Sequence, residues 1–205
     1  MEEILQQLRS TGDYLGAMMT HEKAAAEAAP EAARTKNFDK QTEAGRLFAR
    51  DFDAFVSAAR TAWNYLIQAA DVAGSRQWLD QRLEANLFKF HRELANQKIH
   101  KYGVEFGVTQ TVRVEGEGFV PMIQTRFGAV PAQRSLRIDL NVTEFVSMAY
   151  QFNPRNLEPD VAALCESILR QYGNETVVEL GARYLDGLSQ VFKSGERRGR
   201  FSVPT

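Results

Sequence analysis

The sequence predicts an α+β fold, namely a mainly helical bundle with a small inserted antiparallel β-meander. Three observations predict it. Apolar residues recur at helical spacing from about Thr42 to Ile67, from Ser75 to His100 and again after Pro159. The stretch from about 104 to 152 is instead rich in β-branched and aromatic residues. A hydrophobic fraction of 44% and a charged fraction of 25% over 205 residues are typical of a globular chain with a proper core.

The helical parts divide into two regions. Residues 1–40 are predicted to form a peripheral helix, interrupted at Thr11–Asp13, and an Ala-rich connector that contains Pro30. Residues 41–205 form the main domain. Its first helix ends at Gly74, and Ser75 caps a second helix that packs antiparallel to the first.

The β-insert follows at about 104–152. Its predicted strands are Val104–Glu115, Phe119–Phe127, Ser135–Val142 and Ala149–Phe152, with Gly116–Gly118 as a turn. Two further helices come after it. The first begins at Pro159 and ends near Gly173, and the last runs from Val177 to Gly195.

Charge and cysteine content bound the function. Lys+Arg 25 against Asp+Glu 26 leaves a net charge of -1, so the chain as a whole does not attract nucleic acid or an anionic membrane. The single cysteine, Cys165, forms no intramolecular disulfide, and we expect a cytoplasmic protein. No stretch approaches the roughly 18 apolar residues of a membrane span, so no membrane partner is expected.

Several common chemistries lack their residues. His21-Glu22 begins like a zinc-protease helix, but Ala25 stands where the second histidine belongs. Gly116-Glu117-Gly118 lacks the third glycine of a dinucleotide loop. We therefore expect no metal and no cofactor.

The segment Phe88–Tyr102 carries the densest set of functional groups. At about 100° per residue, Arg92, Asn96 and His100 fall at about 0°, 40° and 80° around the helix, so they share one face. A permanent cation, an amide and an imidazole suit attack on a phosphodiester, in which the imidazole moves a proton and the cation holds the phosphate. In the alternative interpretation, His100 and Asn96 only stabilise the helix end.

At these residues the chain resembles the HEPN superfamily of helical, RNA- and nucleotide-associated domains, whose signature is an Arg, often followed by Asn, and a His a few residues later. Asn96-x-x-x-His100 is similar to the second half of this signature. The helix Phe52–Leu66 resembles the first helix of such domains, and the resemblance covers about residues 44 to 192. Ala95 departs from the signature, because the family places its arginine there; Arg92 lies one turn earlier.

The resemblance implies a homodimer that binds RNA or a nucleotide, and in active members a metal-independent ribonuclease site; here it assigns catalysis to His100, Asn96 and Arg92. Whether this chain cleaves RNA or only binds it is left open by Ala95. The alternative function is that of a non-catalytic interaction or structural protein, such as an accessory subunit of a defence, phage or stress system. Further RNA contacts are assigned to five basic residues: Lys98, Lys101, Arg197, Arg198 and Arg200.

Overall fold

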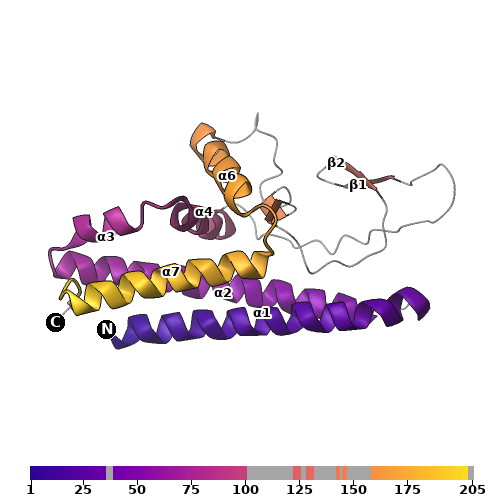
Figure 1. Cartoon of the computed structure of the whole chain (residues 1–205), viewed down its shortest axis with the longest axis horizontal. Coiled ribbons are helices and arrows are strands. Elements are labelled where there is room, and N and C mark those ends of the chain that lie inside the picture. The colour runs from indigo at the N-terminus through magenta and orange to yellow at the C-terminus, as the bar shows by residue number, and fades with distance from the viewer. Residues whose placement is uncertain are drawn as a thin grey trace.

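The computed structural model describes residues 1–35, 39–100, 122–125, 128–131, 142–143, 145–146 and 158–202. Its helices are α1 (Glu2–Thr35), α2 (Asp39–Val72), α3 (Arg76–Arg82), α4 (Asn86–His100), α6 (Pro159–Tyr172) and α7 (Val177–Arg197). Two short strands, β1 (Met122–Thr125) and β2 (Gly128–Pro131), pair antiparallel with Met122 opposite Pro131. Figure 1 shows α1, α2 and α7 running along the long axis, with α3, α4 and α6 on one side of them.

The predicted α+β class is wrong, because the described part of the chain is a helical bundle. Of the predicted β-insert, the structure describes one hairpin, β1 with β2, and four residues of helical backbone: Val142, Thr143, Phe145 and Val146. The predicted strands Val104–Glu115 and Ala149–Phe152 lie outside the described residues.

The helical backbone at Val142 lies where the third predicted strand was expected to end. Val142, Phe145 and Val146 are all fully buried, and Phe145 meets Phe52 of α2 edge-on with ring centroids 5.4 Å apart. The spacing of three and four places these side chains on one helical face, so burial against α2 outweighs the strand preference of valine. The β-branched content of the segment therefore misled the strand prediction.

The first two helices form the longest pair of the bundle. Helix α1 continues without interruption through Thr11–Asp13 and through the Ala-rich tract to Thr35. Its buried residues Ile4, Leu15 and Met18 belong to the same core as α2 and α7. Figure 1 shows the α1–α2 pair extending beyond α7 at the end opposite the two chain termini.

The second predicted helix is divided into two. Helix α3 ends at Arg82, and α4 begins at Asn86. Ser75 makes no side-chain cap at the start of α3; its hydroxyl instead donates to the Arg200 carbonyl oxygen, and the Ala70 carbonyl oxygen lies 3.4 Å away. The predicted capping role of Ser75 is therefore wrong, and the residue joins the end of α2 to the C-terminal segment.

The last two helices agree with the sequence prediction. Pro159 stands in the first turn of α6, and Gly173 follows its last residue. Thr176 caps α7 through a reciprocal pair of hydrogen bonds with Glu179. Helix α7 lies close to its neighbours at Gly181, where a Cβ atom would stand 3.2 Å from the Phe55 ring.

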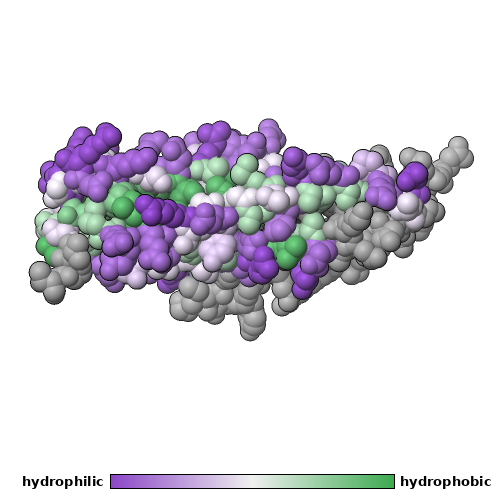
Figure 2. Space-filling view, turned by 90° about the horizontal axis from the view of Figure 1, so that it is seen from below, coloured by the Kyte–Doolittle hydropathy of each residue, from purple (hydrophilic) through white to green (hydrophobic). Residues whose placement is uncertain are grey.

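The face of the molecule on the α1 side is mostly hydrophilic but also carries hydrophobic residues (Figure 2). Figure 2 shows the molecule from the side on which α1 lies, and hydrophobic residues form a band there along the long axis. On α1 the exposed large hydrophobic residues are Leu5, Tyr14 and Met19. Within the described residues, no helix combines the length and the apolar character that crossing a membrane requires.

Candidate functional site

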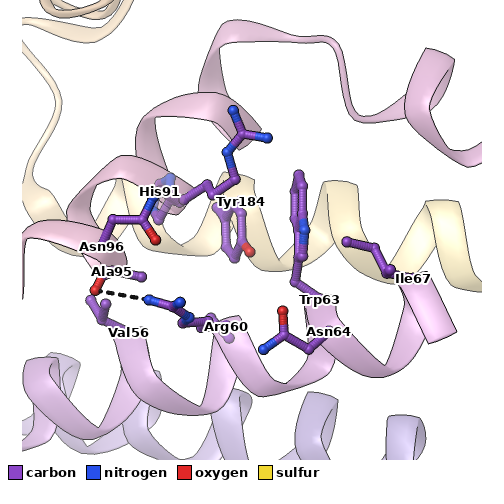
Figure 3. Close-up of a pocket in the computed structure, with 11 residues that line it drawn as sticks. Val56, Arg60, Trp63, Asn64, Ile67, His91, Ala95, Asn96 and Tyr184 are labelled. Carbon is purple, nitrogen blue, oxygen red and sulfur yellow. Dashed lines mark hydrogen bonds between the residues drawn. The ribbon is translucent and has the colours of Figure 1, made fainter. Parts of the chain in front are cut away.

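A cavity of about 200 Å³ lies between α2, α4 and α7. Figure 3 shows its walls: α2 lies below, α4 above and to the left, and Tyr184 of α7 closes the back. Its lining residues are Val56, Ala59, Arg60, Trp63, Asn64 and Ile67 from α2, His91, Arg92, Ala95 and Asn96 from α4, and Tyr184. We call this cavity the cleft.

Both helices contribute one arginine and one asparagine to the cleft. Arg60 and Asn64 stand one turn apart on α2, and Arg92 and Asn96 stand one turn apart on α4. Residues four apart lie on the same face of a helix, so each Arg–Asn pair faces the cleft together. Two Arg-x-x-x-Asn segments therefore supply four of its functional groups.

The two helices run in opposite directions along the cleft. Arg60 contacts α4 at Ala95, whereas Trp63, one turn later on α2, packs against Phe88, earlier on α4. Arg60 therefore lies at the level of Ala95, next to Asn96, on α4. The cleft thus receives a guanidinium and an amide from each of these two helices.

Arg60 is held at the edge of the cleft by one hydrogen bond. Its Nη1 donates to the Ala95 carbonyl oxygen at 3.3 Å, as the dashed line in Figure 3 shows. A guanidinium has five N–H donors in a planar fork, so this bond leaves most of them available to a ligand. Ala95 thus contributes its backbone carbonyl to the position of Arg60.

The charge of the cleft is positive. Among the described residues, no carboxylate forms an ion pair with Arg60 or Arg92, and the lining contains no Asp or Glu. The nearest acidic residue in the sequence, Glu93, follows Arg92 on α4 but does not line the cleft. Two cations at a concave surface, without a counter-ion in the described part of the chain, favour an anionic ligand.

Aromatic rings form the deep wall. The rings of His91 and Tyr184 stack with centroids 4.0 Å apart and planes 14° apart. Tyr184 also meets Phe88 edge-on, and Phe88 lies against Trp63. The rings are held by packing from three helices, so this wall is rigid.

His91 is a neutral residue in this wall. Burial lowers the pKa of His91 from 6.5 to about 4. Its Nδ1 lies 3.0 Å from the Leu87 carbonyl oxygen. Because a carbonyl oxygen only accepts, Nδ1 carries the proton and donates, which makes Nε2 the acceptor nitrogen at neutral pH.

Of the three predicted catalytic residues, the structure brings two to the cleft. Arg92 and Asn96 line it, and Arg92 is exposed at its mouth. His100 is the last residue of α4, and its side chain lies outside the described part of the chain. The structure therefore shows two of the three predicted catalytic side chains at the cleft, and the position of the third is not described.

The other predicted RNA contacts lie elsewhere or outside the described residues. Lys98 belongs to α4, but its side chain is not described, and Lys101 lies outside the described residues. Arg197, Arg198 and Arg200 are exposed at the C-terminal end of α7. Arg197 is thirteen positions after Tyr184, about 20 Å along the helix, so these arginines are not part of the cleft.

Sequence reasoning missed four residues of the cleft: Arg60, Asn64, His91 and Tyr184. The repeated Arg-x-x-x-Asn spacing was visible and would have pointed to the first two. No pattern marked His91 and Tyr184, because both occupy positions that are typical of a helical core.

Comparison with known proteins found no matching family model, no matching curated protein and no matching solved structure. The described residues also contain no group of His, Cys, Asp and Glu side chains that could hold a metal ion.

Proposed function

We propose that the chain binds RNA or a nucleotide in the cleft without cleaving it. The observation that carries the proposal is that Arg60 and Arg92, with no carboxylate partner among the described residues, line the same cavity as Asn64 and Asn96. Guanidinium groups match phosphate oxygens in fork geometry, and amides supply both donors and acceptors for a base or a sugar. Because the net charge is -1, the attraction to phosphate is local to the cleft.

The state of His91 supports binding in preference to cleavage. General acid–base catalysis works best when the pKa of the group lies near the working pH. Burial lowers the pKa of His91 to about 4, so at neutral pH it has no proton to give on Nε2 and is a weak base. The imidazole of the cleft therefore serves as part of the wall.

The test uses Arg92→Gln, which removes the charge and keeps a polar side chain. We expect single-stranded RNA to bind about tenfold more weakly to this variant at low salt, and the slope of log K against log salt to fall by about 0.7, one phosphate contact. Anisotropy of labelled RNA in EDTA measures binding, and gel analysis of the same samples should show intact RNA.

Arg9→Gln is the matched control, because Arg9 is an exposed arginine on α1 away from the cleft. It should leave the affinity unchanged. If both variants lost RNA affinity equally, RNA would bind to positive charge anywhere on the surface and not to the cleft. If the unaltered protein bound no RNA, the proposal would be overturned. RNA cleavage in EDTA would overturn its non-catalytic part.

The hydrophobic band in Figure 2 favours a second role, that of a non-catalytic interaction protein. Exposed apolar patches mark interaction surfaces when they are contiguous. The partner that we propose is a second copy of the chain, since the family resemblance implies a homodimer.

The location that we propose is the cytoplasm. The single cysteine, Cys165, is buried and free, so the fold does not depend on a disulfide that an oxidising compartment would have to form.

A further inference from the structure

The cleft has an apolar interior and a charged mouth. Tyr184, Trp63 and His91, its deep wall, are 2%, 7% and 7% exposed. Arg92 and Asn64 are exposed, and Arg60 and Asn96 are intermediate. A ligand that fills the cleft consequently places an uncharged, flat group inside and its anionic group outside.

Tyr184 places a hydroxyl group in the interior of the cleft (Figure 3). Among the described residues it makes no hydrogen bond, although the side chain is almost fully buried. Figure 3 shows the hydroxyl directed into the cleft, toward the space between Trp63 and Arg60. Burial raises the pKa of Tyr184 far above its usual range, so the hydroxyl keeps its proton and can donate as well as accept.

The hydroxyl is not one of the fully buried unpaired atoms of the described residues, so solvent can reach it. A ligand that fills the cleft displaces that solvent and must hydrogen-bond to the hydroxyl or leave it unsatisfied. His91 adds a second polar group to this wall, an acceptor nitrogen on a ring that stacks with Tyr184. The interior therefore suits a planar group that has hydrogen-bonding edges, and a purely apolar ligand would leave both groups unsatisfied.

The size of the cleft limits what enters it. Its volume of about 200 Å³ is below the roughly 300–1,000 Å³ of pockets that enclose a whole drug-sized ligand. A nucleotide has three parts, and its base is the flat, uncharged one. The base fits the interior, and the ribose and phosphate remain at the mouth beside Arg60 and Arg92.

Building on the proposed function, we propose that the cleft takes one unpaired base of single-stranded RNA, with the adjoining phosphate between Arg60 and Arg92. The bases of an RNA duplex are stacked and paired, and their hydrogen-bonding edges are already occupied. They therefore cannot enter the interior of the cleft. A free nucleotide presents the same base and phosphate but only one phosphate contact, and it binds more weakly than the strand.

The experiment uses Trp63 as a reporter of the interior. The chain has two tryptophans, and Trp78 lies against Phe201, outside the cleft lining. A Trp78→Phe variant keeps the ring contact and leaves Trp63 as the only tryptophan. Its fluorescence is titrated with an oligouridylate, an oligoadenylate, an abasic ribose-phosphate oligomer of equal length, an RNA duplex and uridine monophosphate.

We expect the two single strands to change the fluorescence of Trp63 and to bind most tightly. Uridine monophosphate should change the fluorescence only at higher concentration. The duplex and the abasic oligomer should leave the fluorescence unchanged. Tyr184→Phe, in the same background, should weaken single-strand binding about threefold to tenfold and leave abasic binding unaltered. Tyr14→Phe, an exposed tyrosine on α1, is the matched control and should have no effect.

The failures are distinguishable. If the abasic oligomer or the duplex binds as tightly as the single strands, the cleft recognises only the phosphate groups. Insertion of a base into the cleft is then overturned, whereas the proposal that the chain binds RNA stands. If uridine monophosphate binds as tightly as the strands, the ligand is a free nucleotide. If no probe binds at low salt, the proposed function fails together with this inference.

Discussion

Arg60 and Arg92 occupy equivalent positions on two antiparallel helices, each one turn before an asparagine that faces the same cavity. A single Arg–Asn pair on a helix surface is ordinary, because long polar side chains are usually solvated. The second pair matters since it faces the first across a concave surface whose described lining contains no carboxylate. At the scale of single residues, the site is thus a property of two helices together.

His91 predicts how stability depends on pH. In the unfolded chain its pKa is near 6.5, and in the folded protein burial lowers its pKa to about 4. Above about pH 6.5 the residue is neutral in both states, and between 6.5 and 4 only the unfolded chain takes the proton. The free energy of unfolding should therefore fall by on the order of 3 kcal/mol as the pH falls through this range.

Urea unfolding at about pH 7 and at about pH 4.5 measures this fall. In His91→Phe, which keeps an aromatic ring beside Tyr184, the fall should become smaller, because the titrating group is gone. An identical pH dependence in the two proteins would show that His91 is not the group responsible.

Among the elements, the C-terminal segment has a structural role that its polar composition hides. Phe201 packs between Trp78 and Phe192, with ring centroids 5.9 and 6.1 Å away. The Ser202 N–H donates to the Ala69 carbonyl oxygen at 3.1 Å, and the Ser75 hydroxyl donates to Arg200. The segment therefore ties the end of α7 to the turn between α2 and α3.

Gly195 makes this attachment testable. A Cβ atom on Gly195 would lie 2.1 Å from Cε2 of Phe201, so Gly195→Ala must displace the ring. We expect a loss of about 1–3 kcal/mol in the free energy of unfolding, measured by chemical denaturation. Adding Phe201→Ala should cost much less in this variant than in the unaltered protein, because the two residues share one contact.

Gly16→Ala is the control for this substitution. Gly16 also lies inside a helix, but a Cβ atom there would meet nothing within 4 Å. Alanine is the better helix former, so this variant should gain about 0.5–1 kcal/mol. Equal effects at both glycines would mean that Phe201 does not occupy the space beside Gly195.

The elements also show where sequence periodicity was sufficient. The long helix α2 and the helices α6 and α7 were predicted with ends close to those observed, because each has a continuous apolar stripe and a clear end signal. The break at Leu83–Ala85 was missed, since the apolar spacing continues across it. Local pattern does not encode the change of direction that places α4 over α2.

For the molecule as a whole, the hydrophobic band on the α1 side leads to a prediction about assembly. Met19 is 54% exposed on α1, so a charge there costs the core nothing. If the protein is the proposed homodimer through this side, light scattering should give the dimer mass, and Met19→Glu should raise the dissociation constant at least about tenfold through charge burial.

Gln6→Glu, an exposed position on the same helix that introduces the same charge, is the control and should leave the mass unchanged. A monomer mass for the unaltered protein at every concentration would contradict the homodimer. A dimer that Met19→Glu leaves intact would place the interface elsewhere.

By itself, the sequence determined the helices α2, α6 and α7, their apolar faces and the alignment of Arg92 with Asn96 on α4, because all of these follow from a period of 3.6 residues. Only the tertiary structure decided that Val142 is helical, that Ser75 binds the C-terminal segment, and that Arg60 and Asn64 join the pair on α4. These features depend on contacts between residues distant in the chain, and local spacing carries no information about which faces meet.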